Sequence, residues 1–173
     1  MKKISIEQFD EVYHLFQQSF IPAELRPYQQ MKELFEKDMF TIYAQYEKDA
    51  LLGAMIVWEL KSCIYLENFA VDSQMRGKGL GSQFLKEFCC LYKDDFLFLE
   101  VEEPHDEISK RRIQFYEKWK FVLNPYHYLQ PTFRGQDQPV SLTMMTYPHI
   151  MSEEQYKKIK KEIFEVVYQK GEL

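Results

Sequence analysis

The sequence predicts an α+β fold in which helices cover the faces of a mixed β-sheet. Three observations carry this prediction: apolar residues recur at helical spacing near both ends of the chain, three β-branched and aromatic segments follow one another, and helix and strand patterns then alternate. The length of 173 residues suits one domain. We therefore expect residues 1–173 to form a single domain.

Two helices are expected first. Ser5 followed by Gln8 is a capping-box pattern, and apolar residues then recur at helical spacing up to a helix end near Pro22. The predicted apolar positions are Ile6, Phe9, Val12, Phe16 and Phe20. The segment "PYQQMKELFEK" predicts a short second helix with Pro27 in its first turn.

The periodicity then changes to that of strands. "MFTIYAQYE", "LLGAMIVWEL" and "SCIYLENFAV" are rich in β-branched and aromatic residues. Short polar breaks at Glu47–Asp49 and Lys61–Ser62 read as hairpin turns. Because parallel pairing needs a longer crossover, these three strands are expected to be antiparallel.

A helix and a strand follow a glycine-rich turn. "LGSQFLKEFCCLY" predicts a helix with five apolar residues on one face: Leu80, Phe84, Leu85, Phe88 and Leu91. The mostly apolar segment Asp95 to Glu102 predicts a central strand.

The last part of the chain repeats the alternation. "DEISKRRIQFYEKW" predicts a helix whose apolar positions include Ile108, Ile113, Phe115, Tyr116 and Trp119. "FVLNPYHYLQPTF" and "VSLTMMTY" predict two late strands joined by the polar loop "RGQDQP". "SEEQYKKIKKEIFEVVYQ" predicts a final helix with Ser152 as its cap. Its predicted buried stripe is Ile159, Ile163, Phe164 and Val167.

Composition narrows the function classes. The net charge of −5 argues against nucleic-acid binding through bulk electrostatics, and no apolar run is long enough for a transmembrane helix. Acidic residues interrupt the N-terminal segment before a signal peptide could form. We expect a cytoplasmic protein that binds neither nucleic acid nor membranes.

The chain has few cysteines and only isolated histidines. Cys63, Cys89 and Cys90 form neither a disulfide framework nor a zinc pattern, and we expect all three to be buried small hydrophobes in a reducing compartment. His105 has no second histidine at ligand spacing, so no metal is expected.

The stretch "NFAVDSQMRGKGLGSQFL" contains three of the six glycines, Gly77, Gly79 and Gly81, interleaved with Arg76 and Lys78. They could simply form a tight turn or cap a helix. Alternatively, bare N–H groups at the start of a helix could converge on a phosphate. The spacing does not fit a Walker loop, and in a dinucleotide fingerprint Ser82 would occupy the third glycine position.

The stretch does fit Q-x-x-G-x-G, through Gln74, Gly77 and Gly79. Together with the downstream segment "RRIQFYEKWKF", it closely resembles the coenzyme A pyrophosphate loop and the A-x-x-F-Y-x-x-x-G-F segment of the GNAT N-acetyltransferase superfamily. The order of elements is similar over nearly the whole chain. Lys120 stands where the family has a glycine, a difference that bears on substrate specificity more than on cofactor binding.

The resemblance implies a central, mixed, mostly antiparallel sheet of about seven strands flanked by helices, in the order ααβββαβαββ with a C-terminal helix. It also implies acetyl-CoA as cofactor. The main chain of Phe69, Ala70 and Val71 would pair with the pantetheine amides. The pyrophosphate would lie on the N–H groups of Gln74, Met75, Arg76, Gly77, Lys78, Gly79, Leu80, Gly81 and Ser82.

The resemblance assigns proton donation to the departing thiolate to Tyr116. Since an alkylammonium must lose a proton before it attacks, a carboxylate in the cleft would serve as base. Glu67 is the first candidate because it lies two residues before Phe69, and Glu100 and Glu102 are alternatives. Each carboxylate could equally be solvated or salt-bridged, and Tyr116 could be an apolar-face aromatic.

Two further segments allow two interpretations each. The basic cluster Lys110–Arg112 is either a solvated helix face or a site for the 3′-phosphate of coenzyme A. The aromatic-rich "NPYHYLQPTF" either lines an acceptor pocket or packs as an ordinary strand.

The leading hypothesis is an acetyl-CoA-dependent N-acetyltransferase acting on a primary amine of a small molecule or peptide. A non-catalytic acyl-CoA-binding module with the same fold is the alternative, and a nucleotide-binding protein is a third hypothesis. A homodimer is left open.

Overall fold

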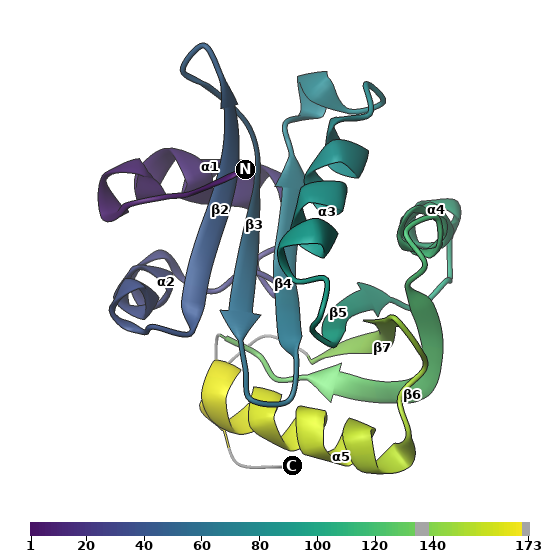
Figure 1. Cartoon of the computed structure of the whole chain (residues 1–173). Helices are drawn as coiled ribbons and strands as arrows, with labels where there is room; N and C mark the ends of the chain where they lie inside the picture. Colours follow the sequence, from purple (N-terminus) through teal and green to yellow (C-terminus); the bar gives the residue numbers. More distant parts are fainter. Residues whose placement is uncertain (134–138, 171–173) are drawn as a thin grey trace. The chain divides into compact units, whose positions relative to one another are not determined.

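The computed structural model describes residues 1–133 and 139–170. The chain divides into two compact units, Met1–Glu59 with Leu66–Lys93, and Leu60–Tyr65 with Asp94–Leu173. The described residues form seven strands and five α-helices, all but β1 labelled in Figure 1, which confirms the predicted α+β class with a mostly antiparallel arrangement. The predicted loop "RGQDQP" lies largely outside the described residues.

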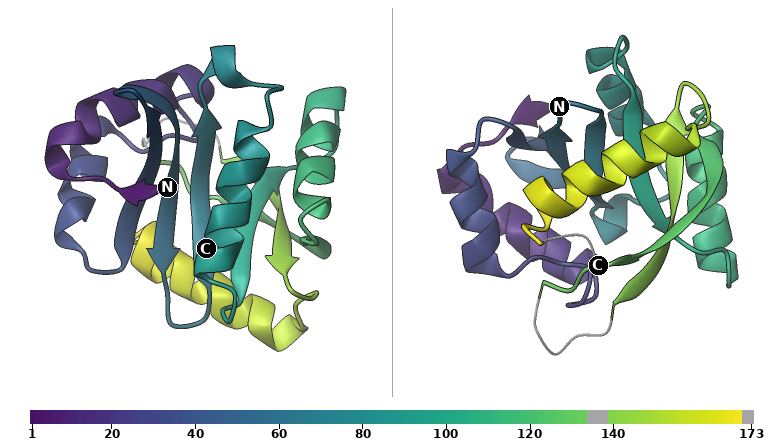
Figure 2. Two further views of the ribbon diagram at one scale, coloured as in Figure 1. Left: turned by 45° about the horizontal axis from the view of Figure 1, so that its top comes forward. Right: turned by 90° about the horizontal axis from the view of Figure 1, so that it is seen from below.

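The first unit contains the N-terminal helices, the hairpin strands and the helix after the glycine turn. Its elements are β1 (Lys2–Lys3), α1 (Phe9–Ser19), α2 (Tyr28–Glu33), β2 (Phe40–Glu47), β3 (Ala50–Glu59), most of β4 (Ile64–Val71) and α3 (Leu80–Leu91). The strands follow the order β1-β2-β3-β4. Helices α1 and α2 cover one face of these strands and α3 covers the other (Figure 2).

Local chemistry explains the hairpin between β2 and β3. Lys48 and Asp49 have φ values of 47° and 68°. Two successive left-handed residues are typical of the type I′ turn, whose twist matches that of the flanking strands. The turn predicted at Glu47–Asp49 is therefore confirmed, and β2 pairs with β3 in antiparallel register from Phe40↔Trp58 onward.

The second unit contains the strands and helices of the C-terminal half. Its elements are β5 (Leu97–Glu102), α4 (Glu107–Glu117), β6 (Val122–Gln130), β7 (Val140–Tyr147), α5 (Glu153–Glu162) and a π-helical stretch, Ile163–Val167. The strand order is β5-β7-β6, with both pairs antiparallel. The predicted stripe of the last helix is buried as expected: Ile159, Ile163, Phe164 and Val167.

Some sequence expectations were wrong in detail. Leu91 is 53% exposed, because Tyr92 takes the buried position at the end of α3 and its hydroxyl donates to Glu59. Ile108 is 67% exposed, because Ser109, Ile113 and Tyr116 form the buried stripe of α4. The other predicted positions of α3 are buried, so periodicity identified the face but not which residue at each helix end is covered.

The N-terminal region also differs from expectation. The capping box at Ser5 and Gln8 is present, but it opens a 3-10 turn over Ile6–Gln8, and Ile6 is exposed. Pro27 lies at the N-cap of α2 and not inside its first turn. Strand β1 was not predicted, since two residues carry no periodicity.

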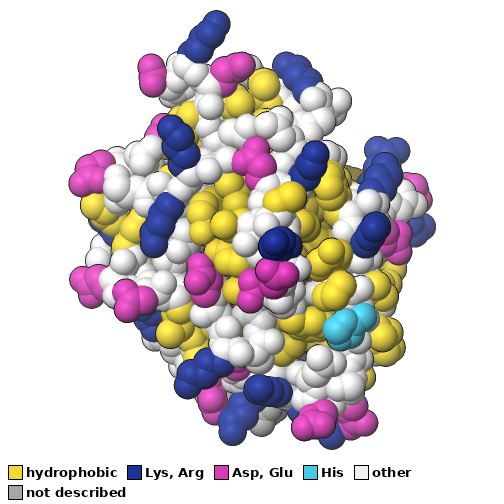
Figure 3. Space-filling view, in the orientation of Figure 1, with side chains coloured by type: hydrophobic (Ala, Val, Ile, Leu, Met, Phe, Trp, Pro, Cys, Tyr) yellow, Lys and Arg dark blue, Asp and Glu magenta, His cyan; other side chains and the backbone are white. Residues whose placement is uncertain are grey.

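The cysteines do not share one environment. Cys63 is buried, but Cys89 is half-buried and Cys90 is exposed, so the expectation of three buried cysteines was wrong. Both exceptions lie near the C-terminal end of α3, which ends at Leu91. On the face shown in Figure 3, lysine and arginine side chains are interspersed with acidic ones.

Candidate functional site

The glycine turn follows β4 within the first unit. The end of β4 is held to β3 because the Asp72 N–H donates to the Leu52 carbonyl at 2.9 Å. The Asp72 side chain then accepts from the Gln74 N–H at 2.8 Å and opens a 3-10 turn over Ser73–Met75. The five residues between β4 and Gly77 thus contain a capped turn, which sets where the glycine loop begins relative to the end of β4.

Gly77 and Gly79 both adopt the left-handed conformation, with φ values of 76° and 82°. Side chains rarely tolerate this region, so glycine is needed for the backbone path itself. A Cβ added at either position would meet no atom within 4 Å. The protein therefore leaves the space beside both glycines open. Gly81 instead lies in the first turn of α3.

The loop presents main-chain donors. The first helical hydrogen bond of α3 runs from the Gln83 N–H to the Gly79 carbonyl at 3.0 Å, so the N–H groups of Leu80, Gly81 and Ser82 precede it. Among the described residues, no loop bond between main-chain groups engages an N–H from Arg76 to Ser82. These donors lie at the positive end of the α3 dipole, which favours an anion.

Two cations accompany these donors. Arg76 and Lys78 are exposed, and Arg76 Nε donates to the Val71 carbonyl at 3.4 Å. Free N–H groups, open space beside Gly77 and Gly79, and two nearby positive charges fit a phosphate or diphosphate ligand. The predicted loop residues are thus brought together with the chemistry that such a ligand needs.

Glu67 is held in a polar cluster within the first unit. Its Oε1 accepts from Arg26 Nη2 at 3.3 Å, and its Oε2 accepts from Trp58 Nε1 at 2.6 Å. The Arg26 and Glu67 side chains are each only 5% exposed, and the guanidinium carbon lies 6.0 Å from the centre of the Trp58 ring. Both carboxylate oxygens are therefore engaged, and the salt-bridged alternative for Glu67 is realised.

Tyr116 lies on α4 in the second unit. Its side chain packs against Phe115 and Phe121, and the residue is 7% exposed. Burial raises the pKa of Tyr116 to about 12, which the nearby Arg112 opposes. The phenol is thus protonated throughout the physiological pH range.

The alternative carboxylates lie on β5. Glu100 Oε2 accepts from the Tyr65 hydroxyl at 3.0 Å and from the Tyr168 hydroxyl at 3.2 Å. Glu102 pairs with Arg112 at 2.7 Å. Sequence reasoning missed the two tyrosines around Glu100, because they lie 35 and 68 residues away in the chain.

The basic cluster of α4 is largely paired with acids. Lys110 lies 3.3 Å from Glu107, and Arg112 contacts Glu102. Arg111 is exposed. These pairs favour the solvated helix face over the phosphate site.

Two of the four histidines lie beside one carboxylate. Glu103 lies 3.0 Å from His105 and 3.5 Å from His127, and its Oε1 accepts from the Ser141 hydroxyl at 2.7 Å. The Ser141 hydrogen bond, followed by the two histidines, lowers the pKa of Glu103. Across the described ranges, no group of three or more His, Cys, Asp or Glu side chains has a metal-binding arrangement.

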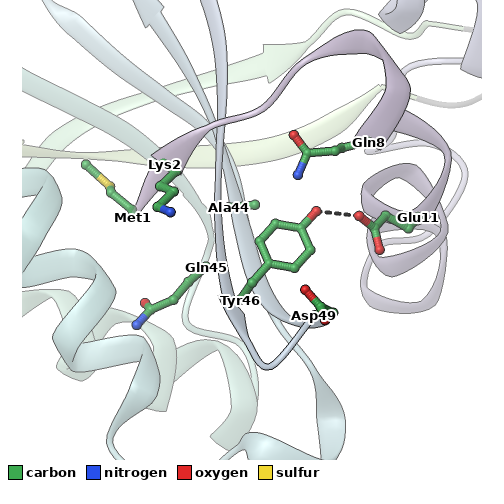
Figure 4. A pocket seen from close by; sticks show the side chains of 8 residues that line it. All are labelled: Met1, Lys2, Gln8, Glu11, Ala44, Gln45, Tyr46 and Asp49. Atoms are coloured by element: carbon green, nitrogen blue, oxygen red, sulfur yellow. Dashed lines mark hydrogen bonds between the residues drawn. The ribbon is translucent and has the colours of Figure 1, made fainter.

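A pocket of about 560 Å³ lies elsewhere in the first unit, between the N-terminal residues, β2 and α1 (Figure 4). Tyr46 donates to Glu11 across it at 2.5 Å. Its lining residues are Met1, Lys2, Gln8, Glu11, Ala44, Gln45, Tyr46 and Asp49. None of them is a predicted site residue.

Within the described segments, no helix is long and apolar enough to cross a membrane.

The protein is thus an α+β protein with a loop at the start of a helix whose donors and charges fit a phosphate-bearing ligand. The model of the acetyltransferase (GNAT) family matches residues 9–121, and the chain belongs to this family. The match includes the glycine loop and Tyr116 and ends at Phe121. Among curated proteins, no sequence match was found.

Solved structures share the fold. A Bacteroides thetaiotaomicron protein assigned to the GNAT acetyltransferase family aligns with a TM-score of 0.88 and 27% identity. The alignment covers 96% of this chain and 97% of the Bacteroides chain. The ribosomal-protein-S18-alanine N-acetyltransferase of Escherichia coli gives 0.66 and 19%, over 88% and 95%. A variant of the spermidine N-acetyltransferase of Vibrio cholerae gives 0.64 and 11%, over 91% and 98%.

Proposed function

We propose that this protein is an acetyl-CoA-dependent N-acetyltransferase that acetylates a primary amine of a small molecule or peptide. The observation that carries the proposal is the set of main-chain donors from Arg76 to Ser82 at the start of α3, beside two open left-handed glycines. Family membership supports acetyl transfer. By their names, the two distant structural relatives reported above acetylate an alanine of a ribosomal protein and spermidine.

The cofactor-binding residues follow from the loop. The main-chain N–H groups from Arg76 to Ser82 would hold the diphosphate, with Arg76 and Lys78 supplying positive charge. The N–H groups of Gln74 and Met75 already donate to Asp72, so these two residues would shape the loop instead. The main chain of Phe69–Val71 would pair with the amides of the pantetheine arm. When bound, acetyl-CoA supplies a thioester carbonyl that an amine can attack.

Tyr116 is proposed as the proton donor to the leaving thiolate. A group with this role must keep its proton at neutral pH, and the raised pKa of Tyr116, about 12, meets that requirement. Tyr116 would supply the proton that the sulfur takes up when the acetyl group passes to the amine nitrogen. The assignment also rests on the match of "FYEKW" to the family pattern.

Glu67 is proposed as the base that takes a proton from the acceptor ammonium. Since Arg26 and Trp58 occupy both of its oxygens, it would act through a water or after releasing one of these donors. Glu100, which accepts hydrogen bonds from two tyrosine hydroxyls, is the second candidate. Replacing each by glutamine distinguishes them, because the true base loses turnover while the other keeps it.

Calorimetry with coenzyme A and a turnover screen of amines with acetyl-CoA test the proposal. Gly77→Asp should abolish coenzyme A binding, because a carboxylate would fill the open space and repel the diphosphate. Tyr116→Phe should bind coenzyme A normally and lose roughly 100-fold in kcat. Tyr92→Phe, which removes another buried hydroxyl, is the matched control and should keep full turnover.

Three results would contradict the proposal. Folded protein that fails to bind coenzyme A would overturn the cofactor assignment, and stabilisation by ATP or NAD instead would favour a nucleotide-binding protein. Binding without turnover of any amine would favour the non-catalytic acyl-CoA module. Undiminished turnover in Tyr116→Phe would refute only the role of Tyr116 and leave the rest of the proposal standing.

A further inference from the structure

The side-chain oxygen of Asn68 is buried without a hydrogen-bond partner in the described structure. The residue is 5% exposed, and its Oδ1 has no hydrogen-bond partner among the described residues. A buried amide oxygen without a partner costs roughly 1–3 kcal/mol, so such groups are rare in native folds. A strand position of this kind would be filled more stably by an apolar side chain.

Asn124 shows what a buried asparagine does when its role is structural. It is 3% exposed, and its Oδ1 accepts from the Met151 N–H at 2.8 Å. Its Nδ2 donates to Thr146 Oγ1 at 2.8 Å and to the Val122 carbonyl at 3.0 Å. This amide ties the start of β6 to β7 and to the segment before α5, whereas the Asn68 oxygen ties nothing together in the described structure.

The position of Asn68 on β4 indicates a ligand. It directly precedes Phe69–Val71, the stretch whose main chain is proposed to pair with the pantetheine arm, and strand residues advance by about 3.3 Å each. Its neighbour Glu67 cannot supply the hydrogen bond, because a carboxylate accepts hydrogen bonds and does not donate them, and the Arg26 and Trp58 donors are directed at Glu67. The missing donor must therefore come from outside these side chains.

We infer that Asn68 is a further cofactor-binding residue, whose Oδ1 accepts a hydrogen bond from a secondary amide N–H of the acyl donor's arm. The inference rests on the proposed function, and it assigns to a side chain a contact that the resemblance gives only to main-chain groups. The oxygen is unbonded without ligand and bonded with it, so the cost carried by the free protein is recovered on binding.

Calorimetric titration with two probes tests this role. Coenzyme A carries the amide arm, and adenosine 3′-phosphate 5′-diphosphate carries the nucleotide and diphosphate without it. Asn68→Leu and Asn68→Ala should each weaken coenzyme A binding by roughly threefold to tenfold, the effect of one neutral hydrogen bond. Affinity for the armless probe should be unchanged in both variants.

Stability supplies a second readout. Asn68→Leu should unfold at the same or a higher urea concentration than the parent protein, since it removes an unbonded polar atom. Asn124→Leu, the matched control, should unfold at a lower concentration, because the Met151 N–H loses its acceptor.

The outcomes separate this inference from the proposed function. If the parent protein does not bind coenzyme A, both fall. If it binds and both Asn68 variants bind equally well, only the role of Asn68 is refuted. Equal weakening of both probes, or a loss of stability in Asn68→Leu like that of Asn124→Leu, would show a structural role and also refute it.

Discussion

Lys120 holds a backbone conformation that favours glycine. Its φ is 65°, and it follows α4 in a Schellman arrangement, in which the Phe121 N–H donates to the Tyr116 carbonyl and the Lys120 N–H to the Glu117 carbonyl. The related family pattern has glycine at this position. The turn geometry is thus kept although the residue has changed, and a side chain projects where the family has none.

Lys120→Gly should stabilise the protein by about 1 kcal/mol. Glycine removes left-handed strain of roughly 1–2 kcal/mol from the folded state, and the greater flexibility of the unfolded chain offsets part of this gain. Urea unfolding measures the change. Lys118→Gly is the control: Lys118 has an ordinary helical φ of −57°, so glycine there should destabilise. Destabilisation by both substitutions would show that the Lys120 turn is unstrained.

At the scale of elements, capping determines where the last helix begins. The Ser152 hydroxyl oxygen accepts from the Gln155 N–H at 3.2 Å, and the Gln155 side chain accepts from the Ser152 N–H at 2.9 Å. At the other end of α5, Glu162 accepts from the Lys61 and Ser62 N–H groups, which fixes the turn before β4. The helix is therefore tied at both ends by side chains.

Ser152→Ala should lower the free energy of unfolding by about 1 kcal/mol, because one N–H in the first turn of α5 loses its acceptor. Ser152→Asp keeps a capping oxygen and should remain close to the parent protein in the same urea titration. Equal stability of the alanine variant and the parent would mean that solvent caps this helix as well as serine does.

At the scale of the whole molecule, several buried or half-buried thiols and phenols hold their protons more tightly than they would in water. Burial raises the pKa of Cys89 from 9.0 to about 11 and that of Tyr116 from 10.0 to about 12. The pKa values of Cys63 and Tyr92 are also raised, mainly by burial. The unfolded chain releases these protons at lower pH than the folded protein does.

Stability should therefore fall as the pH rises from about 9 toward 12, because the unfolded state binds fewer protons in this range. The contribution is fully present below pH 9 and is lost as the pH passes the folded-state values. Urea midpoints at pH 8, 9.5 and 11 measure it, and Tyr116→Phe should flatten the decline above pH 10. A constant midpoint over this range would contradict the burial of these groups.

The sequence by itself determined the local features of this protein. Periodicity and turn residues located nearly every helix and strand, and Gly77, Gly79, Arg76 and Lys78 marked the loop before α3, because backbone conformation and charge are properties of neighbouring residues. The order of elements and two linked motifs sufficed to indicate the family.

Only the tertiary structure decided which groups meet. Arg26 reaches Glu67 over 41 residues of chain, and Tyr168 reaches Glu100 over 68. Whether the Asn68 oxygen finds a donor, and whether Leu91 or Tyr92 is buried, depends equally on what packs around each side chain. A local pattern fixes where a side chain points from its own helix or strand, whereas its partner is set by the packing of segments distant in sequence.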